Sequence, residues 1–354
     1  MICQVVGARP NFVKMAPVVR ESRRRGLDQF LVHTGQHYDA QMSEVFFEEL
    51  GMPRPDLDLG VGSGSHAEQT ARVMLEFEKV LAVRRPRLVV VAGDVNSTLA
   101  CALVAAKVGI PVAHVESGLR SFDREMPEEV NRVLTDHLAD LLFVTEPAGL
   151  ENLRREGIEA GKVQFVGNTM IDSLLEHRER ALARAPWKAL DLEEGGYGLV
   201  TLHRPSNVDG PERAGEIGRG LAAVARKLPL LFPIHPRTRA RSAAAFEGIE
   251  GLRLVEPLGY LDFLALMARA QVDLTDSGGI QEETTALGVP CVTLRKNTER
   301  PITVSDGTNR LVALEATAIA EAALTHRPQS AKVPAMWDGK AAIRVAALIE
   351  GLLD

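Results

Sequence analysis

The chain has 354 residues, of which 45% are hydrophobic and 25% are charged. At about 150 residues per domain, this length predicts two domains, each with enough apolar residues for its own core, and it excludes disorder as the main state. The formal net charge of −6 argues against a general nucleic-acid binder, because such proteins usually carry a basic surface.

Cysteine usage and the first residues favour a reducing compartment. Cys3, Cys101 and Cys291 lie in separate apolar runs, a pattern typical of reduced, buried cysteines and not of a disulfide framework or a zinc cluster. The N-terminal run enters a strand-like segment with no basic stretch ahead of it, so no signal peptide is expected. No window approaches the ~18 apolar residues of a membrane span. We therefore expect a cytoplasmic protein with no membrane segment.

Short apolar runs alternate with helix-length amphipathic segments along the chain. The predicted strands are 2–6, 30–33, 88–92, 111–115, 141–145 and 163–166, followed by 198–202, 230–234, 252–255, 272–275, 290–294 and 311–313. The helices expected between them include 97–109, 128–139, 212–228 and 279–288. Continuously apolar strands that alternate with helices are typical of parallel sheets covered on both faces. The pattern therefore predicts an α/β protein.

The alternation breaks once, near the middle of the chain. Residues 176–196 are charged, include Pro186 and lack a strand pattern, so they are interpreted as a helix that leads into an interdomain linker. Two doubly wound domains follow from this break, over residues 1–175 and 176–335. Neither the run 60–65 nor the end of the first strand fits G-x-G-x-x-G, which disfavours a nicotinamide cofactor.

Ionisable residues follow six of the predicted strands. They are Arg9, Asp94, Glu116, His203, His235 and Asp276. In open parallel sheets, ligands bind beyond the carboxyl ends of the strands. These positions therefore predict a site in a crevice between the two domains.

Three of the polar residues near strand ends also have plainer interpretations. Asp94 or Asp276 could simply cap the helix that follows it. His114 lies inside an apolar run and is more typical of a hydrogen-bonded core histidine than of a catalyst.

Helix positions carry similar alternatives. Glu128 and Glu129 lie in the first turn of a helix, where carboxylates favour the helix dipole, and for at least one of them this capping role is the better interpretation. Phe263, Leu264 and Met267 are at helical spacing, which is typical of core residues.

The segment Asp-Ser-Gly-Gly-Ile-Gln-Glu-Glu at 276–283 has the features of a phosphate site. A strand ends, two glycines allow a close backbone approach, and a helix begins with free N–H groups at its positive end. Glu282 or Glu283, one turn further on, could accept hydrogen bonds from a ribose diol. Together with Arg9, Lys14 and Arg300, the segment predicts a site for a nucleoside diphosphate.

These motifs resemble, in order and over nearly the whole chain, those of the non-hydrolysing UDP-N-acetylglucosamine 2-epimerases. The motifs are Gly7-Ala8-Arg9-Pro10, Thr34-Gly35-Gln36-His37, Gly93-Asp94, His114-Val115-Glu116-Ser117-Gly118-Leu119-Arg120, Pro127-Glu128-Glu129, Asn131-Arg132, His203-Arg204, the 276–283 segment and Thr298-Glu299-Arg300-Pro301. The last two blocks together are specific to the family.

The resemblance implies a glycosyltransferase-B-like fold, with two Rossmann-like domains facing a cleft and a C-terminal helix within 336–354 that crosses back to the first domain. It also implies a homodimer, a UDP-sugar substrate, no metal and no cofactor. The expected cellular role is the supply of UDP-N-acetylmannosamine for surface polysaccharides.

The resemblance also implies roles for particular residues. The candidate catalytic residues are Asp94, Glu116, Glu128 and His203. The candidate substrate-binding residues are Arg9, Lys14, His235, Phe263, Ser277, Gly278, Gly279, Glu283 and Arg300.

In the family's reaction, the proton on carbon 2 is removed while UDP leaves carbon 1, and a 2-acetamidoglucal forms. UDP then adds back and carbon 2 is protonated from the other face. Because the proton leaves from one face of the sugar ring and returns on the other, the reaction requires more than one proton carrier. Asp94, Glu116 and Glu128 are therefore candidate acids and bases. We expect mutual repulsion and burial to raise their pKa values. Which carboxylate serves which face stays open.

Several residues depart from the family's usual pattern. Ala8 and Asn11 stand where many members have Thr and Glu, and Leu258 stands where many have Gln. The exact UDP-sugar is therefore open, and UDP-sugars with additional amino or carboxyl groups are alternatives. A glycosyltransferase of the same fold, a UDP-sugar sensor and a hydrolysing epimerase are rival functions. A second substrate site near Gln36 and His37 is also left open.

Overall fold

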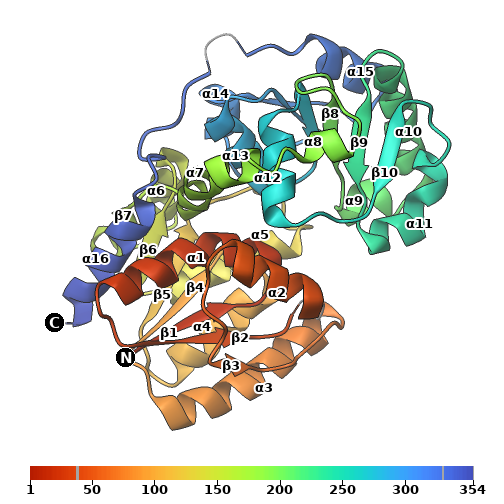
Figure 1. Ribbon diagram of the computed structural model, residues 1–354. Coiled ribbons are helices and arrows are strands. Elements are labelled where there is room, and N and C mark those ends of the chain that lie inside the picture. The colour runs from red at the N-terminus through yellow and green to blue at the C-terminus, as the bar shows by residue number, and fades with distance from the viewer. Residues whose placement is uncertain (37–39, 329–330, 354) are drawn as a thin grey trace. The chain divides into compact units, whose positions relative to one another are not determined.

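The computed structural model describes residues 1–36, 40–328 and 331–353, and it divides into two compact units. Unit 1 comprises Met1–Glu176 together with Ala335–Asp354, and unit 2 comprises His177–Pro334. Figure 1 shows a sheet with flanking helices in each. The helix α7 (Thr169–Leu182) runs through the boundary between them.

Unit 1 contains a seven-stranded parallel sheet in the order β3-β2-β1-β4-β5-β6-β7. Its strands are β1 (Ile2–Val6), β2 (Gln29–His33), β3 (Leu57–Asp58), β4 (Leu88–Ala92), β5 (Val112–Ser117), β6 (Leu141–Val144) and β7 (Val163–Phe165). The strand order reverses between β1 and β4, and ligands bind at such switch points in open α/β sheets. The loops after β1, β4 and β5 therefore converge on one edge of this sheet.

Two rows of helices pack beside this sheet. The helices are α1 (Arg9–Arg24), α2 (Ala40–Glu49), α3 (His66–Arg84), α4 (Asn96–Lys107), α5 (Pro127–Leu138), α6 (Pro147–Arg155), the 3₁₀ turn η1 (Ala160–Lys162) and α16 (Ala341–Leu353). In one row α4 packs against both α3 and α5, and in the other α1 packs against both α2 and α16. Figure 1 shows α1 and α3 on opposite sides of the sheet.

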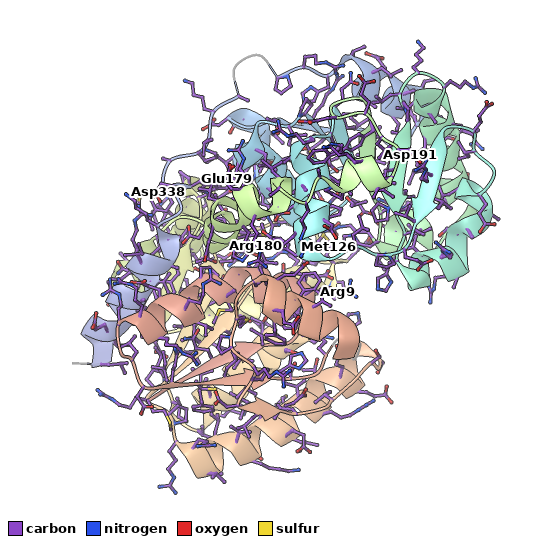
Figure 2. The ribbon with its side chains drawn as sticks, viewed as in Figure 1. Arg9, Met126, Glu179, Arg180, Asp191 and Asp338 are labelled. Atoms are coloured by element: carbon purple, nitrogen blue, oxygen red, sulfur yellow. The ribbon has the colours of Figure 1, made fainter. Side chains whose placement is uncertain are left out.

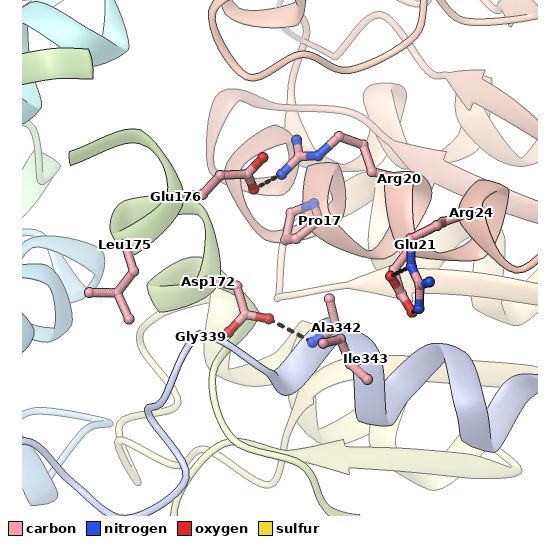
Figure 3. Close-up of a pocket in the computed structure, with 10 residues that line it drawn as sticks. All are labelled: Pro17, Arg20, Glu21, Arg24, Asp172, Leu175, Glu176, Gly339, Ala342 and Ile343. Carbon is pink, nitrogen blue, oxygen red and sulfur yellow. Dashed lines mark hydrogen bonds and ion pairs between the residues drawn. The ribbon is translucent and has the colours of Figure 1, made fainter. Parts of the chain in front are cut away.

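The N-terminus of α16 is held by a carboxylate of α7. Asp172 accepts hydrogen bonds from the amides of Ala341 (3.2 Å) and Ala342 (2.6 Å), as Figure 3 shows for Ala342. Asp338, labelled in Figure 2, lies just before the helix and pairs with Arg344. These contacts join the last residues of the chain to unit 1.

Unit 2 contains a six-stranded parallel sheet in the order β10-β9-β8-β11-β12-β13. Its strands are β8 (Gly198–Thr201), β9 (Leu230–Pro233), β10 (Leu252–Val255), β11 (Val272–Thr275), β12 (Cys291–Thr293) and β13 (Asn309–Leu311). Its helices are α8 (Pro186–Ala189), α9 (Pro205–Val208), α10 (Pro211–Ala225), α11 (Pro236–Phe246), α12 (Tyr260–Ala268), α13 (Gly278–Leu287), α14 (Ile302–Ser305) and α15 (Ala316–Thr325). The strand order reverses between β8 and β11, so the loops after these strands meet at the edge where a ligand binds.

The architecture confirms the predicted fold class of two parallel-sheet α/β domains. All twelve predicted strands are present, with ends that differ by at most two residues. The strand β3 was missed because its two residues are too short to show a pattern. The helix expected from residue 176 begins earlier, at Thr169, and the linker segment contains the short helix α8.

Some expectations from composition are also tested by the fold. Cys3, Cys101 and Cys291 are buried and unpaired, as predicted. Among the described helices, none has both the length and the apolar character that crossing a bilayer requires.

Candidate functional site

The loop after β1 is tied to the end of β4 by Asn11. Its side-chain oxygen accepts hydrogen bonds from the amides of Gly7 (3.2 Å) and Ala8 (3.1 Å), and its side-chain nitrogen donates to the Ala92 carbonyl (2.8 Å). A Cβ on Gly7 would lie only 2.5 Å from Ser97 Oγ, so the close approach requires glycine. The two loops at the switch point therefore form one rigid unit.

Arg9 begins α1 next to this loop and is half-buried. Its guanidinium lies 5.8 Å from the centroid of the Phe46 ring, a distance within the range of cation–π attraction. Arg9 is therefore held at the N-terminus of α1. Both its guanidinium and the positive end of the helix dipole favour an anionic ligand there.

Lys14 and Glu116 form a buried ion pair. Lys14 Nζ lies 2.6 Å from Glu116 Oε1, and the two residues are 5% and 4% exposed. Gly93 completes the contact, because a Cβ there would come within 2.9 Å of the ammonium. Glu116 has a φ of 69°, a left-handed conformation that costs energy outside glycine and is common at functional sites. Lys14, a candidate substrate-binding residue, is therefore paired in this structure with Glu116, a candidate acid/base residue.

Asp94 is half-buried and pairs with Arg132 of α5. The side-chain amide of Asn131 also donates a hydrogen bond to the backbone carbonyl of Asp94, at 2.9 Å. The residue at the N-cap of α4 is Val95, and that helix has no side-chain cap hydrogen bond. The interpretation of Asp94 as a cap for the following helix is therefore wrong.

The adjacent carboxylates at the start of α5 differ sharply. Glu129 is buried and accepts hydrogen bonds from the amides of Ser121 (2.9 Å) and Phe122 (2.8 Å), and it pairs with Arg132 (2.5 Å). Glu128 is half-buried, and its carboxylate has no hydrogen-bond partner among the described residues. Glu129 is therefore structural, and Glu128 is the member of the pair with a carboxylate available for chemistry.

Sequence reasoning assigned no role to Arg132 and did not single out Asp136. Glu128, Arg132 and Asp136 are spaced four residues apart, so they lie along one face of α5. That spacing was a usable signal for a line of charges facing the strand ends. Asp94 and Glu116 are each paired with a cation, Arg132 and Lys14 respectively.

In unit 2, His203 follows β8 and pairs with Asp276 at the end of β11. Its Nδ1 lies 3.0 Å from Asp276 Oδ1, and its imidazole is 57% exposed. Asp276 also accepts hydrogen bonds from the Arg204 amide (3.0 Å) and the Asn207 side chain (3.1 Å). Burial alone would raise the pKa of Asp276, but the pairing with His203 and the Arg204 amide hold it below its usual value. Asp276 thus orients the histidine ring.

The start of α13 only partly matches the predicted phosphate cradle. Ser277 is its N-cap residue and makes no side-chain cap bond, so the interpretation of Asp276 as a cap for this helix is wrong. The Ser277 amide donates to the Thr275 hydroxyl at 3.0 Å, which leaves Gly278 and Gly279 as the residues whose amides open the helix. A Cβ on Gly278 would lie 2.3 Å from Arg300 Nη1. The glycine therefore lets the guanidinium lie against the helix start.

Arg300 is buried in a cluster of charges. It forms ion pairs with Glu282 (2.9 Å) and Glu299 (2.5 Å), and Glu299 also pairs with Arg295 (2.7 Å). Sequence reasoning placed Arg300 on the diphosphate and offered Glu282 or Glu283 for the ribose, but it gave Glu299 and Arg295 no role. The acidic partners fix the guanidinium in one position beside the glycines.

Glu283, on the next turn of α13, is buried. Burial, and then the neighbouring charge of Glu282, raise its pKa to about 8, so its carboxyl is mostly neutral at pH 7. A neutral carboxyl can both donate and accept hydrogen bonds, which suits recognition of a sugar hydroxyl pair.

Two further candidates occupy less defined positions. His235 is exposed just before α11. Leu264 and Met267 of α12 are fully buried, but Phe263 is half-buried, so its interpretation as a core residue is wrong.

Gln36 is part of the unit 1 edge, where its side-chain oxygen accepts hydrogen bonds from the Ser97 amide (3.1 Å) and hydroxyl (2.7 Å). His37, its partner in the predicted second substrate site, lies outside the described residues. Within residues 1–36, 40–328 and 331–353, no group of three or more His, Cys, Asp or Glu side chains is placed to hold a metal ion.

Comparison with known proteins places this geometry in a family. The model of the UDP-N-acetylglucosamine 2-epimerase family matches residues 20–350. The UDP-N-acetylglucosamine 2-epimerase of Methanocaldococcus jannaschii is 46% identical over 319 residues, which cover 87% of each chain. The chain belongs to the UDP-N-acetylglucosamine 2-epimerase family.

Solved structures of family members agree with the fold. The crystal structure of the Methanocaldococcus jannaschii epimerase in complex with UDP-GlcNAc and UDP has a TM-score of 0.93 at 42% identity and covers 99% of both chains. The Neisseria meningitidis epimerase bound to UDP-GlcNAc has a TM-score of 0.89 at 30% identity, again over 99% of both chains. A kitacinnamycin glycosyltransferase, at 15% identity and a TM-score of 0.57 over 99% of this chain and 98% of its own, shares the fold alone.

One relative in the family acts on a different sugar. The UDP-2,3-diacetamido-2,3-dideoxy-D-glucuronate 2-epimerase of Pseudomonas aeruginosa is 42% identical over 328 residues, with 92% of this chain and 91% of the relative covered. Family membership therefore defines the reaction class more closely than the sugar.

Proposed function

We propose that this enzyme interconverts UDP-N-acetylglucosamine and UDP-N-acetylmannosamine by eliminating UDP to a 2-acetamidoglucal and adding it back. The proposal is supported by Asp94 and Glu116 at the ends of β4 and β5, each held by a cation, and by Glu128 in the first turn of α5, the helix whose Arg132 holds Asp94. A protein that only bound UDP-sugars would have no use for three such carboxylates.

In this mechanism the unit 1 carboxylates move the proton at carbon 2. One of them removes it on one face of the ring, and another returns a proton on the opposite face. Lys14 keeps Glu116 in place and balances its charge while the proton moves. The Asp94–Arg132 pair acts in the same way at the end of β4.

Unit 2 is proposed to hold UDP. The amides of Gly278 and Gly279 and the guanidinium of Arg300 would bind the diphosphate, and Glu283 the ribose. His235 and Phe263 are proposed to contact the nucleoside, and Arg9 is proposed as a further substrate-binding cation. His203, oriented by Asp276, would assist the departing diphosphate. Firm retention of UDP matters, because loss of the glycal would turn an epimerase into a hydrolase.

The testing experiment is incubation of the purified protein with UDP-N-acetylglucosamine alone, followed by NMR of the sugar. An epimerase yields UDP-N-acetylmannosamine with no acceptor present. A glycosyltransferase would need an acceptor, a hydrolysing epimerase would release free N-acetylmannosamine, and a sensor would leave the substrate unchanged.

A second candidate substrate is UDP-2,3-diacetamido-2,3-dideoxy-D-glucuronate, which is favoured by the 42% identity to the Pseudomonas aeruginosa enzyme. Side-by-side kcat/KM values for the two UDP-sugars decide between them. The proposed primary function requires the higher value with UDP-N-acetylglucosamine.

We further propose a cytoplasmic homodimer that supplies surface-polysaccharide synthesis. Three buried, unpaired cysteines suit a reducing compartment. On unit 1, Leu75 and Val83 of α3 are 61% and 81% exposed, an apolar surface that a second copy could cover. Light scattering during size-exclusion chromatography tests the dimer, which should have about twice the 38.4 kDa of the chain.

A further inference from the structure

His114 occupies the interior of β5 in unit 1 and is fully buried, as sequence reasoning expected of a core histidine. Both nitrogens of its ring make hydrogen bonds. Nδ1 lies 2.7 Å from Asp136 Oδ1 on α5, and Nε2 lies 2.8 Å from the Gly93 carbonyl at the end of β4. One imidazole therefore joins three elements of the candidate site.

Both ring nitrogens of His114 face acceptors. A carbonyl oxygen can only accept, so Nε2 must donate to Gly93. The other oxygen of Asp136 accepts hydrogen bonds from the Gly118 amide (3.0 Å) and the Arg120 guanidinium (2.7 Å), and this neighbouring cation favours an ionised carboxylate. Nδ1 therefore also donates. The geometry is satisfied by an imidazolium with a proton on each nitrogen.

The charges around the ring agree with this state. Burial alone would raise the pKa of Asp136, but its pairing with His114 and Arg120 holds it below its usual value. Arg120 shares its charge with Glu156, to which it donates two hydrogen bonds of 2.7 Å. Two cations and two carboxylates thus alternate in the order His114, Asp136, Arg120 and Glu156. Glu156 lies just beyond the end of α6.

The contacts of His114 and Asp136 fall immediately beside the candidate acid/base residues. The Gly93 carbonyl directly precedes Asp94, and Gly118 follows Glu116 by two residues. Gly93 and Gly118 have positive φ values, of 65° and 81°. Glu116, which lies between His114 and Gly118 in the sequence, also has a positive φ, of 69°. Glycine adopts a positive φ without strain, but Glu116 does not, and it needs external contacts to hold this conformation.

We propose that His114 and Asp136 are positioning residues, which fix the Asp94 and Glu116 loops to the helix that carries Glu128. The inference rests on the proposed function, since it assigns a purpose to the placement of the three carboxylates. A shift of about 1 Å in such groups costs on the order of 10²-fold in rate. The residues proposed to bind UDP, Gly278, Gly279, Glu283 and Arg300, belong to unit 2 and are not part of this network.

Two isosteric substitutions separate the contacts of the ring. His114→Gln places an amide where Nε2 was and keeps the bond to Gly93, whereas His114→Asn keeps the bond to Asp136 and loses Gly93. Each variant breaks one of the two bonds by which the ring connects Gly93 to α5, so we expect kcat to fall on the order of 10²-fold in both. UDP affinity by calorimetry should match the parent in both. The control is His137→Gln, because His137 is exposed on the same helix and, among the described residues, its ring is hydrogen-bonded to the Val133 carbonyl alone.

The protonation of the ring is tested on the parent protein, with no variant required to fold. In protein labelled with ¹⁵N-histidine at pH 7.5, His114 should show a directly bonded proton on both ring nitrogens, in signals that are absent from His114→Gln. A ring with one such proton would overturn the assignment. So would parent-like kcat in both variants, or a loss of kcat that parallels a loss of UDP affinity. If the parent epimerises no UDP-sugar, the proposed function fails, and the ring spectrum alone decides the state of His114.

Discussion

Glu129 is held by two backbone amides and an arginine, whereas Glu128, the preceding residue of α5, has no hydrogen-bond partner among the described residues. Glu128→Gln should therefore keep the parent's stability and lose about 10²–10⁴-fold in turnover, the usual contribution of an acid/base group. Glu129→Gln should instead lower the free energy of unfolding by about 1.5–3 kcal/mol, because buried charge-assisted hydrogen bonds are lost.

Turnover and urea unfolding of the two variants are the measurements. Equal turnover losses with equal destabilisation would contradict the division of roles between the two residues.

The buried Lys14–Glu116 pair leads to a second prediction. Lys14→Met leaves a carboxylate buried without its cation and should destabilise the protein by about 3–5 kcal/mol. Adding Glu116→Gln should restore much of the stability but not the activity. Lys79→Met is the matched control, since the Lys79–Glu76 pair is exposed and worth about 0–1 kcal/mol. A double variant no more stable than Lys14→Met would refute the coupling.

The contact between Gly278 and Arg300 gives a third prediction. In Gly278→Ala the new Cβ would lie 2.3 Å from Arg300 Nη1, so the guanidinium must move. Loss of one charge-assisted contact, about 1.5–3 kcal/mol, should weaken UDP binding by roughly 10- to 150-fold. Calorimetric titration with UDP measures it. In Gly215→Ala, the control, the nearest atom is Arg219 Nη1 at 3.8 Å, and affinity should not change. Parent-like affinity in Gly278→Ala would remove Arg300 from the UDP site.

The ionisation of Asp172, the residue that accepts hydrogen bonds from the start of α16, leads to a prediction about how the free energy of unfolding depends on pH. Burial raises its pKa to about 6 from the usual 3.8, in spite of the hydrogen bonds from Ala342 and Ala341. The folded state therefore binds the proton more tightly than the unfolded state between pH ~4 and ~6. Its contribution to stability is present below this window and is lost as pH rises through it, by about 3 kcal/mol in total.

Asp172→Asn should flatten that part of the stability–pH curve in urea unfolding. Asp338 beside it is the contrast, because pairing with Arg344 lowers its pKa and gives the opposite sign. A curve for Asp172→Asn that matches the parent between pH 4 and 6 would contradict the assignment.

The sequence could predict strands and the residues that follow them, because continuous apolar runs and strand-end polar residues are local patterns. It placed Asp94, Glu116 and His203 at the carboxyl ends of β4, β5 and β8, where the structure has them. It could not predict which cation faces which carboxylate. Lys14 and Glu116 are 102 residues apart, and their pairing depends on the sheet order β1-β4-β5.

The same limit explains the incorrect cap interpretations. An Asp after a strand and before a helix has the local pattern of an N-cap residue. For Asp94 and Asp276 the decisive partners, Arg132 and His203, come from other elements. Glu128 and Glu129 were indistinguishable in sequence for a similar reason, since the amides that bind Glu129 come from the loop at Ser121 and Phe122.

The central claim is that the carbon 2 proton leaves the sugar and is replaced through the carboxylates of unit 1. The most direct test is incubation of the enzyme with UDP-N-acetylglucosamine in D₂O, with the product examined by NMR and mass spectrometry. We expect UDP-N-acetylmannosamine with deuterium at carbon 2, and a turnover at least 10²-fold lower in Asp94→Asn. Product that retains its original hydrogen at carbon 2 would contradict it.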